Sequence, residues 1–88
     1  MTITRDYAFQ LFISQQQKCA LSGQEIFLSE KEKNTTASLD RIDSNQGYEV
    51  GNVQWVHKDL NIMKNQISEQ EFKQFCKLVS EKENANIR

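Results

Sequence analysis

Residues 35–66, TTASLDRIDSNQGYEVGNVQWVHKDLNIMKNQ, decide the fold of this chain. Their β-branched and apolar residues predict one strand over 35–42 and a second over 52–56. Between them, the segment DSNQG at 43–47 carries residue types that favour turns. A helix is expected from about 57 to 66, directly after the second strand. The stretch therefore predicts a β-hairpin followed at once by a helix.

Two further helices are expected on either side of this stretch. The N-terminal helix covers 4–18, with Thr4 as its N-cap. The C-terminal helix starts at a capping box formed by Ser68 and Glu71. Its apolar residues recur on one face: Phe72, Phe75, Cys76 and Val79. With a short β element before the hairpin, this order predicts an α+β protein with a single domain over residues 1–88.

Composition and charge exclude some classes of protein. Apolar residues make up 38% of the 88 residues and charged residues 26%, as in ordinary globular domains. There is no apolar run of the ~20 residues that cross a bilayer and no signal-peptide pattern, so we expect a cytoplasmic protein without a membrane partner. The net charge of −1 gives no general attraction for nucleic acid, and contact with DNA therefore needs a local arrangement. We expect the charged segment 29–34 to be a solvated loop, and Cys19 and Cys76 to be reduced thiols.

The helix expected after the hairpin has an apolar side and a polar side at about 100° per residue. Leu60, Met63 and Ile67 share the apolar side, and we expect them to belong to the core. One imidazole and two amides follow each other on the polar side at i, i+4 and i+8: His57, Asn61 and Asn65. Periodicity alone favours an ordinary polar flank for this row.

The position of Asp40 at the end of the first strand gives the polar side a second interpretation. A carboxylate there and the amide oxygen of Asn61 on the helix can together hold a hard divalent cation, because Mg²⁺ takes one or two carboxylates and leaves positions for phosphate oxygens. Asp43, in contrast, precedes turn-forming residues and is expected to be an ordinary turn residue. Trp55 is expected in the core, and Tyr48 is expected to pack across the loop.

Several segments occur together at a fixed spacing: LDRID at 39–43, GY at 47–48, GNVQWV at 51–56, and Asn61 with Lys64. This combination resembles an HNH endonuclease of the ββα-metal superfamily, and QKCALSG at 17–23 resembles the knuckle that precedes the motif in that family. The resemblance covers roughly residues 15–75, with a motif core at about 35–67. It implies a hairpin and a helix wrapped around one divalent metal ion, with the helix against the DNA backbone.

The resemblance implies a role for each matching residue. Asp40 matches the metal ligand at the strand end, and Asn61 matches the first metal ligand on the helix. Asn65 stands where some members place a second helical ligand, and Asn52 matches the residue that ties the loop and orients the site. The implied ion is one Mg²⁺ or Mn²⁺. The candidate contacts to DNA phosphates are Arg41, Lys58 and Lys64.

Arg41 stands where most members of the family carry the histidine that acts as general base. A guanidinium stays protonated up to pH ~12 and offers only donors, so it cannot accept a proton. Arg41 could instead clamp the scissile phosphate or stabilise its developing charge. His57 is the one imidazole in the sequence and is the candidate replacement base. It has two other interpretations, as a remnant of the knuckle or as a helix-start residue that hydrogen-bonds nearby.

Many members of the family also bind zinc through two CxxC knuckles. The corresponding positions of this chain are Cys19, Ser22, His57 and Leu60. Structural zinc takes four protein ligands, and two of these four residues can ligate, so structural zinc is not expected. Packing of the two outer helices is expected to supply the stability instead.

The leading hypothesis is a small HNH-type endonuclease, or nicking enzyme, that hydrolyses DNA phosphodiester bonds with one divalent metal ion. Its catalytic residues would be Arg41, His57 and Asn52. The alternative is a catalytically impaired module that kept the fold and binds DNA, or binds and inhibits a protein partner, as small phage-type proteins can. A third hypothesis makes the chain one domain or subunit of a larger nuclease.

Overall fold

The structure is a computed structural model that describes residues 2–28 and 35–85. Within these ranges the chain forms three helices and one two-stranded antiparallel hairpin, which confirms the α+β class, and no helix there is long and apolar enough to cross a membrane. The segment 29–34, expected to be a solvated loop, lies outside the described residues. The elements follow in the order α1 (Arg5–Ser14), β1 (Ala37–Arg41), β2 (Val53–His57), α2 (Lys58–Lys64) and α3 (Glu69–Ala85).

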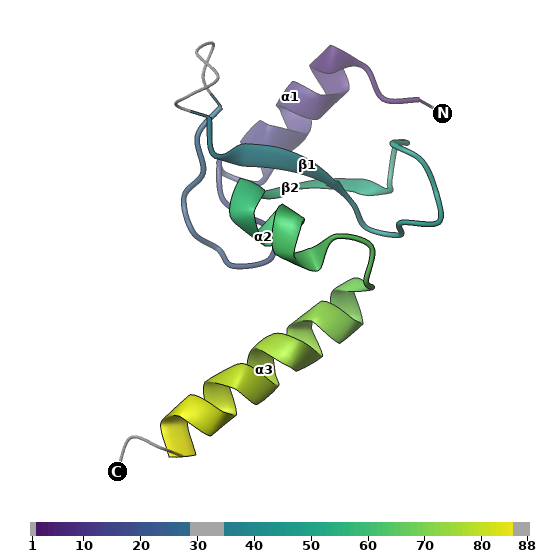
Figure 1. Cartoon of the computed structure of the whole chain (residues 1–88). Coiled ribbons are helices and arrows are strands. Elements are labelled where there is room, and N and C mark those ends of the chain that lie inside the picture. Colours follow the sequence, from purple (N-terminus) through teal and green to yellow (C-terminus); the bar gives the residue numbers. More distant parts are fainter. Residues whose placement is uncertain (1, 29–34, 86–88) are drawn as a thin grey trace.

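The hairpin lies between α1 and α2 (Figure 1). Its strands pair in a register that runs from Ala37 opposite His57 to Arg41 opposite Val53. Because α2 begins at the residue after β2 ends, the helix folds back on the hairpin and contacts both strands. The predicted order of hairpin and then helix is confirmed, with strand ends within two residues of those expected.

The core is formed where α1 and the chain that follows it pack against the hairpin. Trp55 of β2 packs edge-to-face on Phe12 of α1, with ring centroids 5.6 Å apart and 74° between the ring planes. The indole N–H of Trp55 donates to the carbonyl of Ala8 at 2.8 Å, so its polar atom is satisfied while the ring is buried. The prediction that Trp55 belongs to the core is confirmed. The buried members of this cluster are Phe12, Cys19, Ile26, Ala37, Trp55 and Val56.

Helix α1 begins as predicted and ends earlier than predicted. The hydroxyl of Thr4 accepts a backbone N–H of the first turn at 3.0 Å, which confirms it as the N-cap. The helix stops at Ser14, so the prediction that it continues to residue 18 is wrong. Gln16 and Gln17 have φ values of 58° and 60°, in the left-handed region where a right-handed helix cannot continue.

The side chain of Gln15 joins the C-terminal end of α1 to β2. Its amide oxygen accepts the backbone N–H of Trp55 at 2.9 Å, and its Nε2 donates to the Trp55 carbonyl at 3.0 Å. Nε2 also donates to the carbonyl of Lys18 at 2.9 Å. Gln15 therefore gives the edge of β2 the pair of hydrogen bonds that a neighbouring strand would give.

Helix α2 has seven residues and ends where Asn65 adopts a φ of 49°. Leu60 is partly buried against the core, as predicted for the apolar side. Met63 is 63% exposed, so the prediction that it belongs to the core is wrong. The buried residue in the last turn of α2 is Lys64, whose position one turn after Leu60 faces the hairpin.

Helix α3 extends away from the rest of the molecule (Figure 1). Its predicted capping box is confirmed, because the Ser68 hydroxyl accepts the backbone N–H of Glu71 at 3.0 Å. Of the predicted apolar face, Phe72 is buried, whereas Phe75 and Val79 are mostly exposed. The expectation that both outer helices pack into the core therefore holds for α1 and is wrong for most of α3.

Candidate functional site

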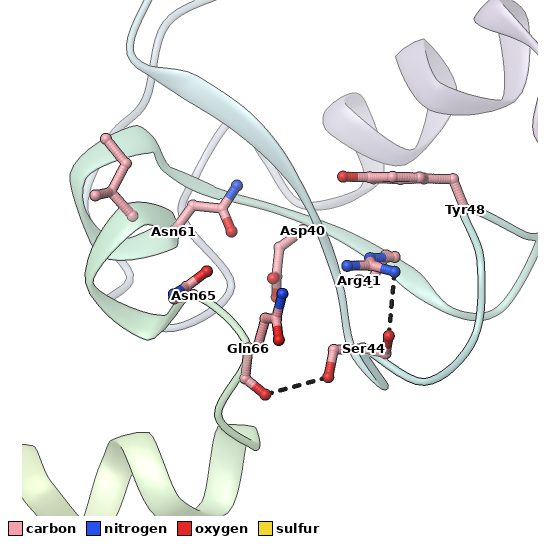
Figure 2. Close-up of a pocket in the computed structure, with 8 residues that line it drawn as sticks. Asp40, Arg41, Ser44, Tyr48, Asn61, Asn65 and Gln66 are labelled. Carbon is pink, nitrogen blue, oxygen red and sulfur yellow. Dashed lines mark hydrogen bonds between the residues drawn. The ribbon is translucent and has the colours of Figure 1, made fainter.

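A polar cleft of about 230 Å³ opens where β1, the hairpin loop and the end of α2 meet. It brings together Asp40, Arg41, Asn61 and Asn65, which the sequence had singled out. Figure 2 shows these side chains around the cleft, with Tyr48 on the loop side. The full lining is Asp40, Arg41, Ser44, Tyr48, Asn61, Ile62, Asn65 and Gln66.

Asp40 forms a buried ion pair with Lys64. Lys64 Nζ lies 3.0 Å from Asp40 Oδ1, and the two side chains are 1% and 4% exposed respectively. Nζ also donates to the carbonyl of Arg41 at 3.3 Å. Two charges removed from water need partners of this kind, because each would otherwise lose its hydration without compensation. Lys64 was expected to contact DNA phosphates. This expectation is corrected, because its ammonium points into the protein.

The second carboxylate oxygen of Asp40 is also occupied. Gln54, which lies opposite Asp40 in the strand register, donates from Nε2 to Asp40 Oδ2 at 3.0 Å. The same Nε2 donates to Glu69 Oε1 at 2.9 Å, and Lys73 pairs with Glu69 at 3.1 Å. Burial raises the pKa of Glu69, but the hydrogen bonds from Gln54 and Lys73 and the charges of Lys73 and Lys64 outweigh it, so the pKa is lowered. The start of α3 is thereby tied to the cleft.

Arg41 presents a positive charge that no acidic side chain neutralises within the described ranges. One of its guanidinium nitrogens donates to the carbonyls of Ser44 at 3.1 Å and Gln46 at 3.3 Å. The guanidinium lies over the ring of Tyr48, 5.5 Å from its centroid, in a cation–π arrangement. Tyr48 is half exposed, and its ring contacts Arg41 of β1, whereas the predicted packing across the loop remains a prediction. The charge of Arg41 is therefore held at the cleft wall.

Asn52 ties the hairpin loop by three side-chain hydrogen bonds. Its Oδ1 accepts the N–H of Asp43 at 2.9 Å, and its Nδ2 donates to the carbonyls of Asp43 at 3.1 Å and Gly47 at 2.8 Å. Asp43 Oδ1 in turn accepts the N–H of Asn45 at 2.9 Å, which confirms the turn predicted for Asp43. The loop-tying role predicted for Asn52 is present in the structure, and its catalytic role remains a prediction.

The two asparagine side chains at the cleft, Asn61 and Asn65, differ in their exposure and hydrogen bonding. Asn61 is half-buried, and its Nδ2 donates to Ser38 Oγ at 2.7 Å, which fixes the amide beside β1. Asn65 is exposed at the end of α2. The hydroxyl of Ser44 donates to the carbonyl of Gln66 at 3.2 Å and joins the loop to the chain after α2 (Figure 2). Ser44 and Gln66 were not predicted, because no periodicity relates a loop residue to a helix end.

His57 does not line the cleft. It is the N-cap of α2, and its Nδ1 accepts the backbone N–H of Asp59 at 3.1 Å. It stands opposite Ala37, at the far end of the hairpin from Arg41. Of the three interpretations of His57, the structure supports the residue at the start of the helix. His57 does not lie at the cleft, where it was predicted to act as general base. Lys58, the next residue, is exposed and also lies outside the cleft lining.

In the segment that resembles a metal knuckle, the sulfur of Cys19 accepts backbone hydrogen bonds. Cys19 is buried, and its Sγ accepts the backbone N–H groups of His57 at 3.2 Å and Ser22 at 3.4 Å. Burial raises the pKa of the Cys19 thiol, but hydrogen bonds from Ser22, His57 and Leu21 outweigh it, so the pKa is lowered. Among the described residues, no three His, Cys, Asp or Glu side chains gather in a way that could hold a metal ion.

The donors of the cleft do not fit the divalent ion that the resemblance implies. Asp40 and Asn61 share the cleft, and a carboxylate with an amide oxygen suits Mg²⁺ chemically. However, both carboxylate oxygens of Asp40 already accept hydrogen bonds, one of them from a buried ammonium. A divalent ion at Asp40 would lie beside the buried Lys64 ammonium, and the repulsion between these like charges opposes its binding.

Comparison of the chain with models of protein families, with curated proteins and with solved structures found no match.

Proposed function

We propose that this chain is a small domain of the HNH endonuclease type that acts on the phosphodiester backbone of DNA. The order β1, β2 and α2 agrees with the hairpin and helix of that family. Four residues assigned by the motif, Asp40, Arg41, Asn61 and Asn65, line one cleft. Asn52 holds the adjoining loop by hydrogen bonds, as the motif requires. The ββα character of the core is part of this proposal.

The observation that carries the proposal is the unneutralised guanidinium of Arg41 at a polar cleft. Its hydrogen bonds to Ser44 and Gln46 use one terminal nitrogen, so the other nitrogens keep donors for a ligand. A guanidinium donates in a planar fork that matches the oxygens of a phosphate. The amides of Asn61 and Asn65 add neutral donors and acceptors around the same space. A phosphodiester is an anion of suitable size and charge for this site.

Hydrolysis at this site would proceed by attack of water on phosphorus, with departure of a sugar oxygen. Arg41 would stabilise the negative charge that develops on the phosphoryl oxygens. Asp40 is the carboxylate of the cleft lining, and we assign it as the acceptor of the proton of the attacking water, through a lone pair that neither Lys64 nor Gln54 uses. These two adjacent residues would be the catalytic pair of the endonuclease.

A second candidate function is DNA binding without hydrolysis. It is favoured by the burial of Asp40, which is 4% exposed and holds hydrogen bonds on both oxygens. It is also favoured by the position of His57 at the other end of the hairpin. The same cleft would then hold a phosphate without activating water, and binding would serve another partner or domain.

The test combines binding and cleavage by the full chain. Fluorescence anisotropy of a labelled DNA duplex is expected to show binding that Arg41→Ala weakens by about tenfold or more, because charged hydrogen bonds are worth ~1.5–3 kcal/mol. Arg5→Ala, which removes an equal charge from the exposed start of α1, is the matched control and is expected to bind like the wild type. Equal weakening by both variants would contradict a specific role for Arg41.

Incubation with supercoiled plasmid then separates the two candidate functions. Nicking by the wild type that disappears in Arg41→Ala supports the endonuclease. Binding that depends on Arg41 without any nicking supports the binding module. Failure of the wild type to bind duplex or single-stranded DNA would remove both.

A further inference from the structure

The Lys64 ammonium lies among oxygen atoms of the kind that a metal ion would take. Its Nζ donates to a carboxylate oxygen, Asp40 Oδ1, at 3.0 Å and to a backbone carbonyl oxygen, that of Arg41, at 3.3 Å. Hard divalent cations bind carboxylate and carbonyl oxygens. We propose that the Lys64 ammonium replaces the divalent cation at this site, so that Asp40 binds no metal ion and the cleft takes a phosphate anion unaided. The part that concerns phosphate rests on the proposed function.

The position of Lys64 makes its ammonium a fixed charge. The residue lies in the last turn of α2, and its side chain is 1% exposed. Helix α2 contacts both strands of the hairpin, so the Cα atom of Lys64 cannot move independently of the hairpin. An ammonium at the surface samples many rotamers in water, whereas this one is held between β1 and α2. The packing therefore holds the Lys64 ammonium at one point of the site.

The carboxylate that would bind a metal is locked on its other side as well. Gln54 Nε2 donates to Asp40 Oδ2 at 3.0 Å and to Glu69 Oε1 at 2.9 Å. Both neighbours of this amide nitrogen are carboxylates, which only accept hydrogen bonds. If the amide were turned by about 180°, its oxygen would face these two acceptors without a hydrogen bond, so the orientation of Gln54 is fixed. Asp40 thus cannot turn toward a new cation without breaking bonds to Gln54 or Lys64.

The charge of the cleft also agrees with an anion that binds without a metal. The charges of Asp40 and Lys64 cancel, which leaves the single positive charge of Arg41 at the lining. A phosphodiester carries one negative charge and would neutralise it. A divalent ion would instead add its charge next to Lys64, where low exposure strengthens the repulsion between like charges.

Binding of Mn²⁺, measured without DNA by loss of the free-ion signal in electron paramagnetic resonance, tests the replacement directly. Wild-type protein is expected to leave the Mn²⁺ signal unchanged at millimolar ion. Lys64→Met removes the ammonium and keeps an unbranched side chain as far as the Cε position, and this variant is expected to bind about one Mn²⁺ per chain. Adding Asp40→Asn to Lys64→Met is expected to abolish that binding.

Two results would overturn the inference. One is stoichiometric Mn²⁺ binding by the wild type that Asp40→Asn removes. The other is a folded Lys64→Met variant that takes up no Mn²⁺, because the place of Lys64 would then not be a cation site. Circular dichroism checks folding. If Lys64→Met is unfolded, the wild type and Asp40→Asn decide the matter, and a wild type that binds no Mn²⁺ supports the inference.

Anisotropy with labelled duplex separates failure of this inference from failure of the proposed function. Wild-type binding is expected to be equal in excess EDTA and in millimolar Mg²⁺ at matched ionic strength. Binding that requires Mg²⁺ would overturn the inference and leave the proposed function standing. Absence of DNA binding under both conditions would overturn the proposed function, while the Mn²⁺ measurement would still decide whether Lys64 replaces the ion.

Discussion

The two ends of the hairpin are held by different chemistry. At the end where Ala37 pairs with His57, the sulfur of Cys19 accepts two backbone N–H groups inside the apolar core. Toward the other end, Asp40 and Lys64 form a buried ion pair beside the cleft. We call these the sulfur end and the charged end. The proposed HNH relationship implies a divalent ion at the charged end, and many members of that family bind zinc at the position of the sulfur end.

This difference teaches that the two ends of one hairpin can differ widely in how much a substitution is expected to destabilise them. A thiol is nearly apolar, so its burial at the sulfur end costs little solvation. A carboxylate and an ammonium each lose strong hydration at the charged end, and their attraction repays this only while both are present. The charged end is therefore expected to be the more sensitive to substitution.

The largest expected effect is that of breaking the ion pair at the charged end. Lys64→Met leaves the Asp40 carboxylate buried without its partner, and we expect the free energy of unfolding to fall by ~3–5 kcal/mol. Urea denaturation followed by circular dichroism measures the change. A loss below about 1 kcal/mol would show that Asp40 finds water or another partner when Lys64 is gone.

The double variant Asp40→Asn with Lys64→Met is the control for this experiment. It removes both charges and keeps the sizes of the side chains, and neutral replacements of buried ion pairs are often tolerated. We therefore expect the double variant to be more stable than Lys64→Met alone. A double variant that loses the sum of the two single losses would argue against coupling between these residues.

A smaller loss is expected at the sulfur end. Cys19→Ala removes a buried sulfur and leaves the N–H groups of His57 and Ser22 without their acceptor, which we expect to cost ~1–3 kcal/mol. The matched control is Cys76→Ala at the exposed cysteine of α3, with an expected change within about 0.5 kcal/mol. If Cys19→Ala proved as costly as Lys64→Met, the contrast between the two ends would be lost.

The smallest effect concerns the pH dependence of the link from the charged end to α3. The pKa of Glu69 in the folded protein is lowered from 4.5, so its ionised form stabilises the folded state. This stability is complete above the unfolded value and is lost as the pH falls through the lower folded value. We expect Glu69→Gln to remove less than about 1 kcal/mol at pH 7 and less at pH 3, because the pair with Lys73 is open to solvent.

Chemical denaturation of Glu69→Gln and wild type at both pH values checks this expectation. Glu81→Gln, which changes an exposed carboxylate farther along α3, serves as the matched control and is expected to follow the wild type. A Glu69→Gln loss that is larger at pH 3 than at pH 7 would contradict the sign of the pKa shift.

Local patterns predicted the elements whose causes are local. Thr4 caps α1 and Ser68 caps α3 because each cap satisfies N–H groups within its own first turn. Asp43 forms its turn with a residue two positions away. Asp40 and Asn61, which we predicted to share one divalent ion, line the same cleft, and the shared ion remains a prediction. The caps and the turn can be predicted without knowing where distant segments lie. The cleft cannot, and for it the resemblance supplied the expected geometry.

Features that depend on distant segments were missed. The side chain of Gln15, at the C-terminal end of α1, bonds to the backbone of β2 forty positions away. Lys64 shares the inward face of α2 with Leu60, a signal present in the sequence, but its charge argued for an exposed position. Its burial becomes favourable only because Asp40 lies 3.0 Å away in the folded chain.

By itself, the sequence determined the class of fold, the caps and turns, and four of the residues that gather at the cleft, because these follow from short-range hydrogen bonding and the spacing of residue types. The tertiary structure alone decided which charges face each other there. Whether a lysine meets a phosphate in solvent or a carboxylate inside the protein depends on the packing of α2 against the hairpin. That packing fixes the distance and the exposure on which the energy of a charge depends.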